Sequence, residues 1–436
     1  MLSDNDLIIN NPLCYKYVQR ELTFIKNKNV KWYNFLMLEN QETLEIVTSE
    51  FTAFFYHRNR LNKSINTKKN NYGTILLMFL NYIFFNRDKQ LKSIEDITLE
   101  IGNEFFNLYV YGDIGRNIVK ANDTIMKAEN SLTAFYYWLY NHPKYKLKNI
   151  SNDMFIIRTV SYIKKGLSSN VKCEKKCLNS IFTVEYPDKI KKPTLKKPSE
   201  FLILTLIEIA KQYDPMLAFP IALQAFAGMR RGEVCQMARQ RIINTQPFGR
   251  SICFCIDLQE ELMLRDDGVR TGMIKRSRIQ LVYEAFLPYL DKLYRAHLII
   301  LKQRGYDSNK YGAMVIGDNG RSMQTNRYAV RFDNLIHRLM DRILDMANKG
   351  DYQATLDKDL LLNYRMTPHS NRYFFTQYVA QREPTHTLAM YRGDLNMNTA
   401  LTYLKDSAHK VKYIHKLQNS FADSYHELTG LTLKEE

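Results

Sequence analysis

The chain has 436 residues, which suits roughly two or three domains and at least one sizeable core. Its 62 Lys and Arg against 45 Asp and Glu give a net charge of +17, which favours a polyanionic partner such as nucleic acid over a surface that is basic for solubility alone. The six cysteines lack the spacing of a disulfide framework, no signal-peptide pattern opens the chain, and the most apolar stretch, residues 72–85, is too short to span a bilayer, so we expect a cytoplasmic protein without a membrane span.

Helical patterns dominate the first third of the chain. Asn40–Glu42 predicts the start of a helix whose apolar face runs through EIVTSEFTAFFYH, and Thr98 predicts the cap of a later one. Two more helices are predicted at 72–86 and 122–140, because apolar residues recur there three and four positions apart. These patterns indicate a compact helical domain.

Basic and aromatic residues interleave in this helical domain, a composition that suits a surface gripping a phosphate backbone. For any single one of these basic residues, a solvated helix face is an equally good interpretation. The residues concerned are Arg58, Arg60, Lys63, Lys68, Lys69, Lys120 and Lys127.

A basic stretch then separates the helical domain from the rest of the chain. It contains KCEKKC and DKIKKPTLKKPSE, with three prolines counting Pro187, and this density of Pro and Lys predicts an extended, solvated connector. Ser199 and Glu200 open the next helix. The expected segments are an N-terminal extension at 1–45, the helical domain at 46–150, the basic linker at 151–198 and a second domain at 199–436.

The second domain mixes helices with strands. Strand candidates at 251–258 and 278–284 flank the turn-like DDGVRTG, and long helices are predicted at 283–305 and 326–350. The predicted fold class is therefore mainly α with a small antiparallel β-sheet.

Three short segments hold residues with chemical potential. The segment GMRRGE contains Arg230, and HSNR places His369 and Arg372 three residues apart. Further on, Gly393 precedes Tyr403. In this order the segments resemble the GLR-x-x-E, H-x-x-R and G-H-(x)8-Y boxes of tyrosine recombinases, the family of phage integrases, Cre and the Xer proteins.

The resemblance covers most of the chain and implies an architecture. Residues 46–150 would be a core-binding, SAM-like DNA-binding domain, and 199–436 the catalytic domain with a C-terminal tail helix that packs on a neighbouring protomer. The resemblance also implies a homotetramer on double-stranded DNA recombination sites, encoded by a mobile element, that cleaves and rejoins DNA through a 3′-phosphotyrosyl intermediate without metal, cofactor or ATP.

The chemistry explains these residue types. Metal-free cleavage of a phosphodiester needs a nucleophile, for which Tyr403 is the candidate, and groups that neutralise charge developing on the phosphoryl oxygens. Arg230 and Arg372 suit this role because each stays charged and offers a planar fork of donors. Glu233 is expected to orient Arg230 through an ion pair, and His369 to handle the proton.

A further family element is a lysine on a strand hairpin that protonates the leaving 5′-oxygen. The family often reads K-T-G where this chain has Arg270, Thr271 and Gly272, and an arginine is a poor proton donor because its pKa exceeds about 12. Lys275, just after the turn, is therefore the candidate general acid. A shift of one residue in strand register would turn it to the opposite face.

Asp394 departs from the family, which carries His or Trp there as a donor to the phosphate. An ionised carboxylate has no proton to donate and repels phosphate unless it pairs with a neighbour such as Arg392. His386 is an alternative donor, or else a capping or packing residue. Of the other tyrosines, Tyr391 and Tyr413 are interpreted as packing residues.

The favoured function is that of a site-specific DNA recombinase or integrase. A type IB topoisomerase uses the same phosphotyrosine chemistry and is the alternative enzyme. The alternative from another class is a DNA-binding protein with a weakened active site. Asp394 and Arg270, which depart from the family pattern, are the reason to keep this alternative. Formation of a covalent adduct by Tyr403 discriminates the enzymes from the pure binder.

Overall fold

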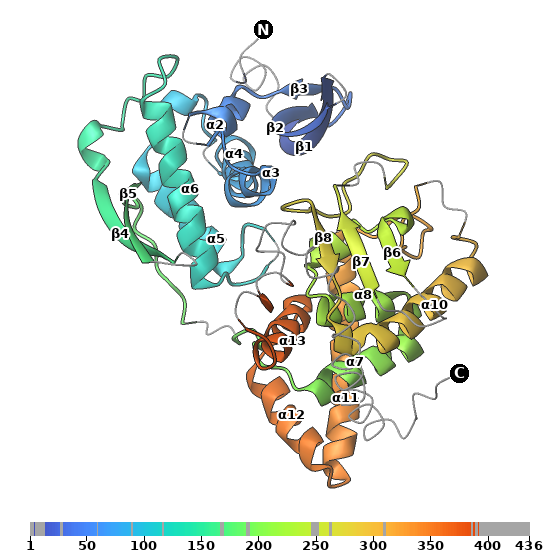
Figure 1. Ribbon diagram of the computed structural model, residues 1–436. Helices are drawn as coiled ribbons and strands as arrows, with labels where there is room; N and C mark the ends of the chain where they lie inside the picture. Colours follow the sequence, from blue (N-terminus) through green and yellow to red (C-terminus); the bar gives the residue numbers. More distant parts are fainter. Residues whose placement is uncertain are drawn as a thin grey trace. The chain divides into compact units, whose positions relative to one another are not determined.

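The computed structural model describes most of the chain before residue 392. It divides into two compact units, unit 1 up to Lys191 and unit 2 from Lys192, each with a hydrophobic core of its own (Figure 1). Helices joined to small antiparallel sheets confirm the predicted fold class. The described residues are 4, 14–26, 29–58, 60–88, 90–115, 117–165, 170–188, 192–245, 253–260, 264–307, 311–384, 387–388 and 391.

Unit 1 contains a three-stranded antiparallel sheet that the sequence analysis missed. Strands β1 (Tyr15–Lys26) and β2 (Asn29–Asn40) form a long hairpin, and β3 (Ile46–Thr48) pairs with the end of β2. The helix expected to start at Asn40 is wrong. The Asn40 side chain accepts two backbone N–H groups, including that of Glu42 at 2.9 Å, and so forms a turn between β2 and β3.

This sheet and the helices of unit 1 share one core. Leu36 of β2 is fully buried in the same cluster as Phe54 and Phe105 from the helical part. The Thr52 hydroxyl donates to the Leu36 carbonyl at 2.8 Å and accepts the Leu36 N–H at 3.0 Å, which joins the sheet to the first helical turn. The hairpin of the expected N-terminal extension is therefore packed as part of unit 1.

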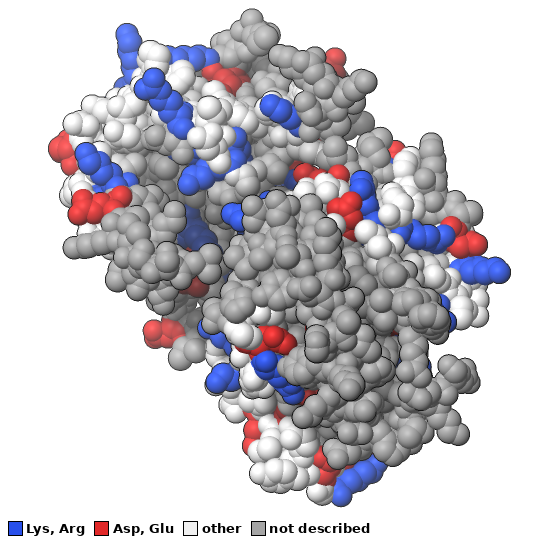
Figure 2. Space-filling view, in the orientation of Figure 1, with Lys and Arg blue, Asp and Glu red and all other residues white. Residues whose placement is uncertain are grey.

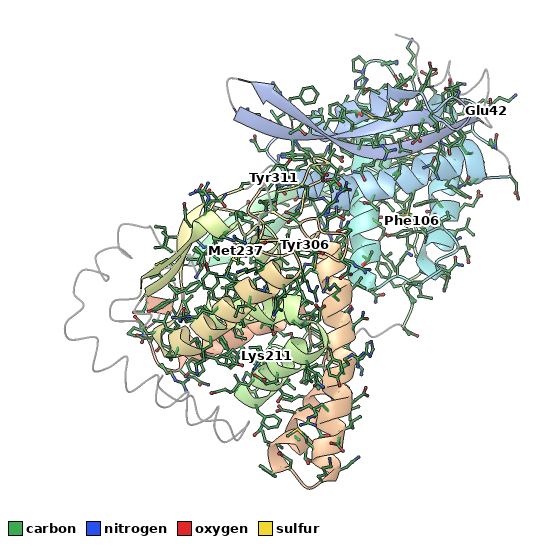
Figure 3. The ribbon with its side chains drawn as sticks, turned by 90° about the vertical axis from the view of Figure 1, so that its right-hand side faces the viewer. Glu42, Phe106, Lys211, Met237, Tyr306 and Tyr311 are labelled. Carbon is green, nitrogen blue, oxygen red and sulfur yellow. The ribbon has the colours of Figure 1, made fainter. Side chains whose placement is uncertain are left out.

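The main helices of unit 1 lie where the sequence predicts them. They are α4 (Thr74–Asn81), α5 (Leu99–Tyr111) and α6 (Asn122–Tyr140), and the Thr98 hydroxyl caps α5 by accepting an N–H of its first turn. Figure 3 shows Phe106 of α5 among these helices, and it is fully buried. The shorter helical elements are η2 (Glu50–Thr52), α2 (Ala53–Tyr56), α3 (Ile65–Thr67), η3 (Lys68–Gly73), η4 (Tyr82–Asn86), η5 (Ile94–Asp96) and η6 (Asn152–Met154).

The extended connector predicted at 151–198 is wrong for its first half. Strands β4 (Ile157–Lys165) and β5 (Asn170–Leu178) form an antiparallel hairpin that lies alongside α6 (Figure 1). The prolines that suggested a connector begin only at Pro187, and the preceding residues include the β-branched and aromatic side chains that suit paired strands.

Two of the basic residues, for which a phosphate contact and a solvated helix face were equally good interpretations, are instead used inside unit 1. The Arg60 Nε donates to the Phe54 carbonyl at 2.7 Å, its guanidinium lies 3.8 Å from the centroid of the Phe54 ring, and burial lowers its pKa to about 10. The Lys68 ammonium donates to the Leu61 carbonyl at 3.1 Å. Arg58, Lys63 and Lys127 are exposed, and Figure 2 shows Lys and Arg side chains spread over the described face of this unit.

Unit 2 packs a three-stranded antiparallel sheet, in the order β6-β7-β8, against its helices (Figure 1). The predicted strands β7 and β8 are confirmed, as are the predicted helices that begin at Glu200, Leu287 and Thr325. Strand β6 and helices α8, α12 and α13 were not predicted. The strands are β6 (Ile242–Thr245), β7 (Cys253–Leu258) and β8 (Arg278–Leu281). The helices are α7 (Glu200–Tyr213), α8 (Pro215–Phe226), α9 (Arg231–Val234), η7 (Arg239–Arg241), η9 (Glu284–Phe286), α10 (Leu287–Gln303), α11 (Thr325–Asn348), α12 (Tyr352–Asn363) and α13 (Pro368–Ala380).

Helix α8 is the centre of unit 2. Every residue from Met216 to Phe226 is buried, so the helix is covered on all sides, and it packs against α7, α10 and α13. The GMRRGE segment follows directly after the C-terminal end of α8. Within the described ranges, no helix is both long and apolar enough to cross a membrane.

Replacing Leu36 by alanine tests whether the hairpin belongs to the core of unit 1. We expect the free energy of unfolding to fall by about 2–5 kcal/mol, because a fully buried leucine leaves a cavity. Leu22, on the same hairpin but 38% exposed, is the matched control, and Leu22→Ala should change stability by less than about 0.5 kcal/mol. Scanning calorimetry of the full chain measures both, and equal small effects would contradict the shared core.

Candidate active site

The first predicted box is a tight turn between α8 and α9. Gly228 has a φ of 62°, in the left-handed region that favours glycine, and a Cβ there would lie 2.5 Å from the Phe375 ring of α13. Arg230 follows at the start of α9, where its N–H donates to Glu233 Oε2 at 2.8 Å and its Nη1 to Glu233 Oε1 at 2.9 Å. The spacing of three residues thus lets one carboxylate hold both the backbone and the guanidinium of Arg230, as predicted for Glu233.

Glu233 also holds a second arginine. The Arg278 guanidinium from β8 donates to both oxygens of Glu233, each at 3.0 Å, in a bidentate pair. Burial raises the pKa of the Glu233 carboxyl, but the bonds from Arg278 and Arg230 outweigh it and hold the pKa below its ordinary value. The fully buried Glu233 is therefore ionised, while the Arg230 side chain stays one-third exposed.

The second box forms the first turns of α13. The Ser370 hydroxyl accepts the Thr367 N–H at 3.0 Å at the start of this helix. His369 in the first turn is exposed, with its ring edge-on to Tyr373 at 4.7 Å between centroids. Arg372 lies one turn further on the same side of the helix and is almost fully buried.

Arg372 and the turn of Arg230 are brought together. Arg372 Nη1 donates to the carbonyl of Gly228, a contact between residues 144 positions apart in the sequence. Since Gly228 is two residues before Arg230, the predicted pair of arginines, Arg230 and Arg372, lies beside the same turn. The close approach of α13 at Phe375 holds this arrangement.

The strand hairpin that was expected to supply a lysine packs on α9, directly after this turn. A Cβ at Gly272 would lie 2.3 Å from the Gly232 carbonyl oxygen, so the two backbones are in direct contact. Arg270 pairs with Glu260 at 2.7 Å. Lys275 is exposed in the bend before β8, three residues from Gly272 and three from Arg278. Three residues of chain span at most about 11 Å, so the backbone of Lys275 lies near the Arg230 turn.

Tyr391 is a packing residue, as predicted. It is buried, its hydroxyl donates to Glu284 at 2.7 Å, and its ring lies edge-on to Tyr283. Burial and the Glu284 carboxylate raise the pKa of Tyr391 well above the ordinary value for tyrosine. Such a phenol is a poor nucleophile.

Several predicted residues lie outside the described part of the chain. They are His386, Arg392, Gly393, Asp394, Tyr403, Tyr413 and the tail helix. The structure therefore brings together Arg230, Glu233 and Arg372, and it places His369 one helical turn before Arg372. The catalytic roles of these residues, of Lys275, of Tyr403 and of Asp394 stay predictions. Among the described residues, no group of three or more His, Cys, Asp or Glu is placed to hold a metal ion.

Arg278 is the site residue that sequence reasoning missed. A signal was present, because Arg278 and Gln280 alternate with apolar residues on a strand of the core sheet and so share one face. The sequence did not reveal that this face is turned to Glu233.

Comparison of the chain with known proteins finds matches among solved structures. No family model matches it, and no curated protein matches its sequence. Among solved structures it is similar to the integrase of the Tn1549 transposon in complex with circular intermediate DNA, at 18% identity and a TM-score of 0.42 over 79% of this chain and 91% of that one. It is similar to the XerH site-specific recombinase bound to its difH substrate, at 15% identity and a TM-score of 0.39 over 79% and 77% of the two chains. It is also similar to a lambda integrase bound to DNA, at 11% identity and a TM-score of 0.35 over 66% of this chain and 73% of that one. These structural neighbours are integrases and site-specific recombinases, but the likeness is distant, and the assignment of function depends on the site residues.

Alanine at Gly228 tests the close approach of α13 to the turn. Gly268 is the matched control, because its φ of 65° equals that of Gly228 within a few degrees while no atom lies within 4 Å of its Cβ position. Both variants carry the backbone strain, but only Gly228→Ala meets Phe375, so it should lose about 1–3 kcal/mol more stability. Denaturant unfolding measures the difference, and equal losses would contradict the packing.

Glu233→Gln should destabilise the folded protein by about 3–5 kcal/mol near neutral pH, because it leaves Arg278 buried without its counter-charge. The folded pKa of Glu233 lies below the ordinary value of 4.5, so its stabilising effect is complete above pH 4.5 and is lost as pH falls through the folded pKa. The stability gap between wild type and variant should therefore narrow below pH 4.5. Urea unfolding at several pH values tests this, and a constant gap would argue against the ionised pair.

Proposed function

We propose that the protein is a site-specific DNA recombinase that breaks and rejoins DNA through a covalent bond to Tyr403. The observation that supports this most strongly is the meeting of Arg372 and the Arg230 turn, from segments far apart in the sequence. Two arginines beside one turn suit a phosphoryl group with two non-bridging oxygens. They match the order and spacing of the boxes that the sequence resembles.

In the proposed reaction, Tyr403 Oη bonds to the scissile phosphorus and the 5′-oxygen leaves. Arg230 and Arg372 neutralise the charge that develops on the non-bridging oxygens. Their positions are fixed before reaction, by Glu233 and by the Gly228 carbonyl respectively, so little reorganisation is needed.

Two proton transfers complete the step. The ordinary pKa of a tyrosine is about 10, so the hydroxyl needs an acceptor, and the exposed His369 in the first turn of α13 is the proposed one. Lys275 donates a proton to the leaving 5′-oxygen. The energy of the phosphodiester is kept in the 3′-phosphotyrosyl bond, so religation by a 5′-hydroxyl needs neither ATP nor metal.

Asp394 stands where the family carries a His or Trp donor to the phosphate. Its ionised carboxylate offers no proton to a phosphate oxygen, so in our proposal the arginine pair carries more of the charge stabilisation than in the family. The DNA-binding role of unit 1, assembly as a homotetramer and action on the ends of a mobile element are further parts of the proposal.

A suicide substrate tests the proposed chemistry. The purified protein is incubated with nicked duplex from the ends of its own element, without metal or ATP, and a denaturing gel is run. We expect a DNA-linked protein band that is absent in Tyr403→Phe, although this variant should bind the DNA as tightly as wild type. Salt-sensitive binding without any adduct would contradict an enzyme and indicate a DNA-binding protein. An adduct together with relaxation of plasmids lacking the site would indicate a topoisomerase instead.

A further inference from the structure

A chain of buried polar side chains leads away from the arginine turn. Glu233 holds Arg278 as described, and Arg278 Nε donates in turn to Gln280 Oε1 at 3.0 Å. The Gln280 Nε2 then donates to the carbonyls of Tyr391 and Leu281. Gln280 is 1% exposed and Arg278 8%, so these bonds are shielded from water.

The direction of these bonds follows from the chemistry of the groups. A guanidinium has donors only, so the oxygen of the Gln280 amide must face Arg278. Its NH2 group must then face the Tyr391 carbonyl, which can only accept. Arg278 therefore fixes the orientation of the amide that holds Tyr391, and a flipped amide would lose bonds at both ends.

Tyr391 is held on three sides. Its carbonyl accepts from Gln280, its hydroxyl donates to Glu284, and its ring packs at 5.2 Å from that of Tyr283. The chain then continues toward Tyr403, twelve residues later. The anchored residue is thus the last described point before the segment that carries the proposed nucleophile.

We infer that Arg278 and Gln280 are positioning residues that tie the segment carrying Tyr403 to the turn carrying Arg230. This inference rests on the proposed function. Glu233 is the junction, because the same carboxylate holds Arg230 on one side and Arg278 on the other. Loss of the bond from Gln280 to Tyr391 would free the point from which the chain leads to Tyr403, and a misplacement of a reacting group by about 1 Å can cost up to about a hundredfold in rate.

Two substitutions of Gln280 remove its bond to Tyr391. Gln280→Glu keeps an oxygen for Arg278 Nε but, when ionised, has no donor for the carbonyls of Tyr391 and Leu281. Gln280→Met keeps the approximate volume and removes all three bonds. Tyr289→Phe is the matched control, because it removes one hydrogen bond of a buried side chain, to Glu208 at 2.9 Å, elsewhere in unit 2.

The readouts are the single-turnover rate of adduct formation on the nicked duplex, the Kd for uncleaved DNA and the Tm. We expect both Gln280 variants to form the adduct about tenfold more slowly or worse, with Kd unchanged within about twofold. Tyr289→Phe should form the adduct at the wild-type rate, even if its Tm falls by as much as that of the Gln280 variants.

Three results would overturn the inference. Gln280 variants that react within twofold of wild type would show that the bonds donated by Gln280 do not affect the reaction. An equal slowing in Tyr289→Phe would show that general loosening of unit 2 is responsible. Absence of an adduct in wild type itself would instead remove the proposed function, and the inference with it.

Discussion

The arrangement of the site depends on one buried carboxylate, that of Glu233. Burial alone disfavours the charged form of a carboxyl in its position and raises its pKa. Two arginines make it ionised, and it in turn allows Arg278 to be buried as an ion. Replacing such a cluster by apolar residues often costs little stability, so its energetic contribution alone does not explain it. Orientation is the better explanation, since the carboxylate fixes the Arg230 guanidinium while leaving it partly exposed.

The catalytic pattern could be predicted from sequence where it is local. The three-residue spacing between Arg230 and Glu233 matches one turn of helix, and His369 and Arg372 share a helix face for the same reason. Helices such as α5 and α6 were predictable because their apolar periodicity and the cap at Thr98 agree. Local signals of this kind do not depend on the rest of the fold.

Features that depend on distant partners could not be predicted. The β1–β2 hairpin is stabilised by burial of one face against helices, and its sequence alone resembles a mixed aromatic segment. Arg60 and Lys68 looked like surface charges until the structure showed their contacts with carbonyls and rings. For Arg278, the alternating strand pattern indicates which face of the strand the side chain is on. It does not indicate that the partner on that face is Glu233, 45 residues earlier in the sequence.

The most direct measurement of the central claim, that Arg230 neutralises phosphate charge, uses a substrate without that charge. A methylphosphonate at the scissile position replaces one charged non-bridging oxygen by a methyl group. With an ordinary phosphate, Arg230→Ala should form little adduct, while with the methylphosphonate it should form the adduct at least tenfold faster than with phosphate, and Tyr403→Phe should form none on either. Arg230→Ala that stays equally inactive on both substrates, although folded and bound to DNA, would contradict the claim.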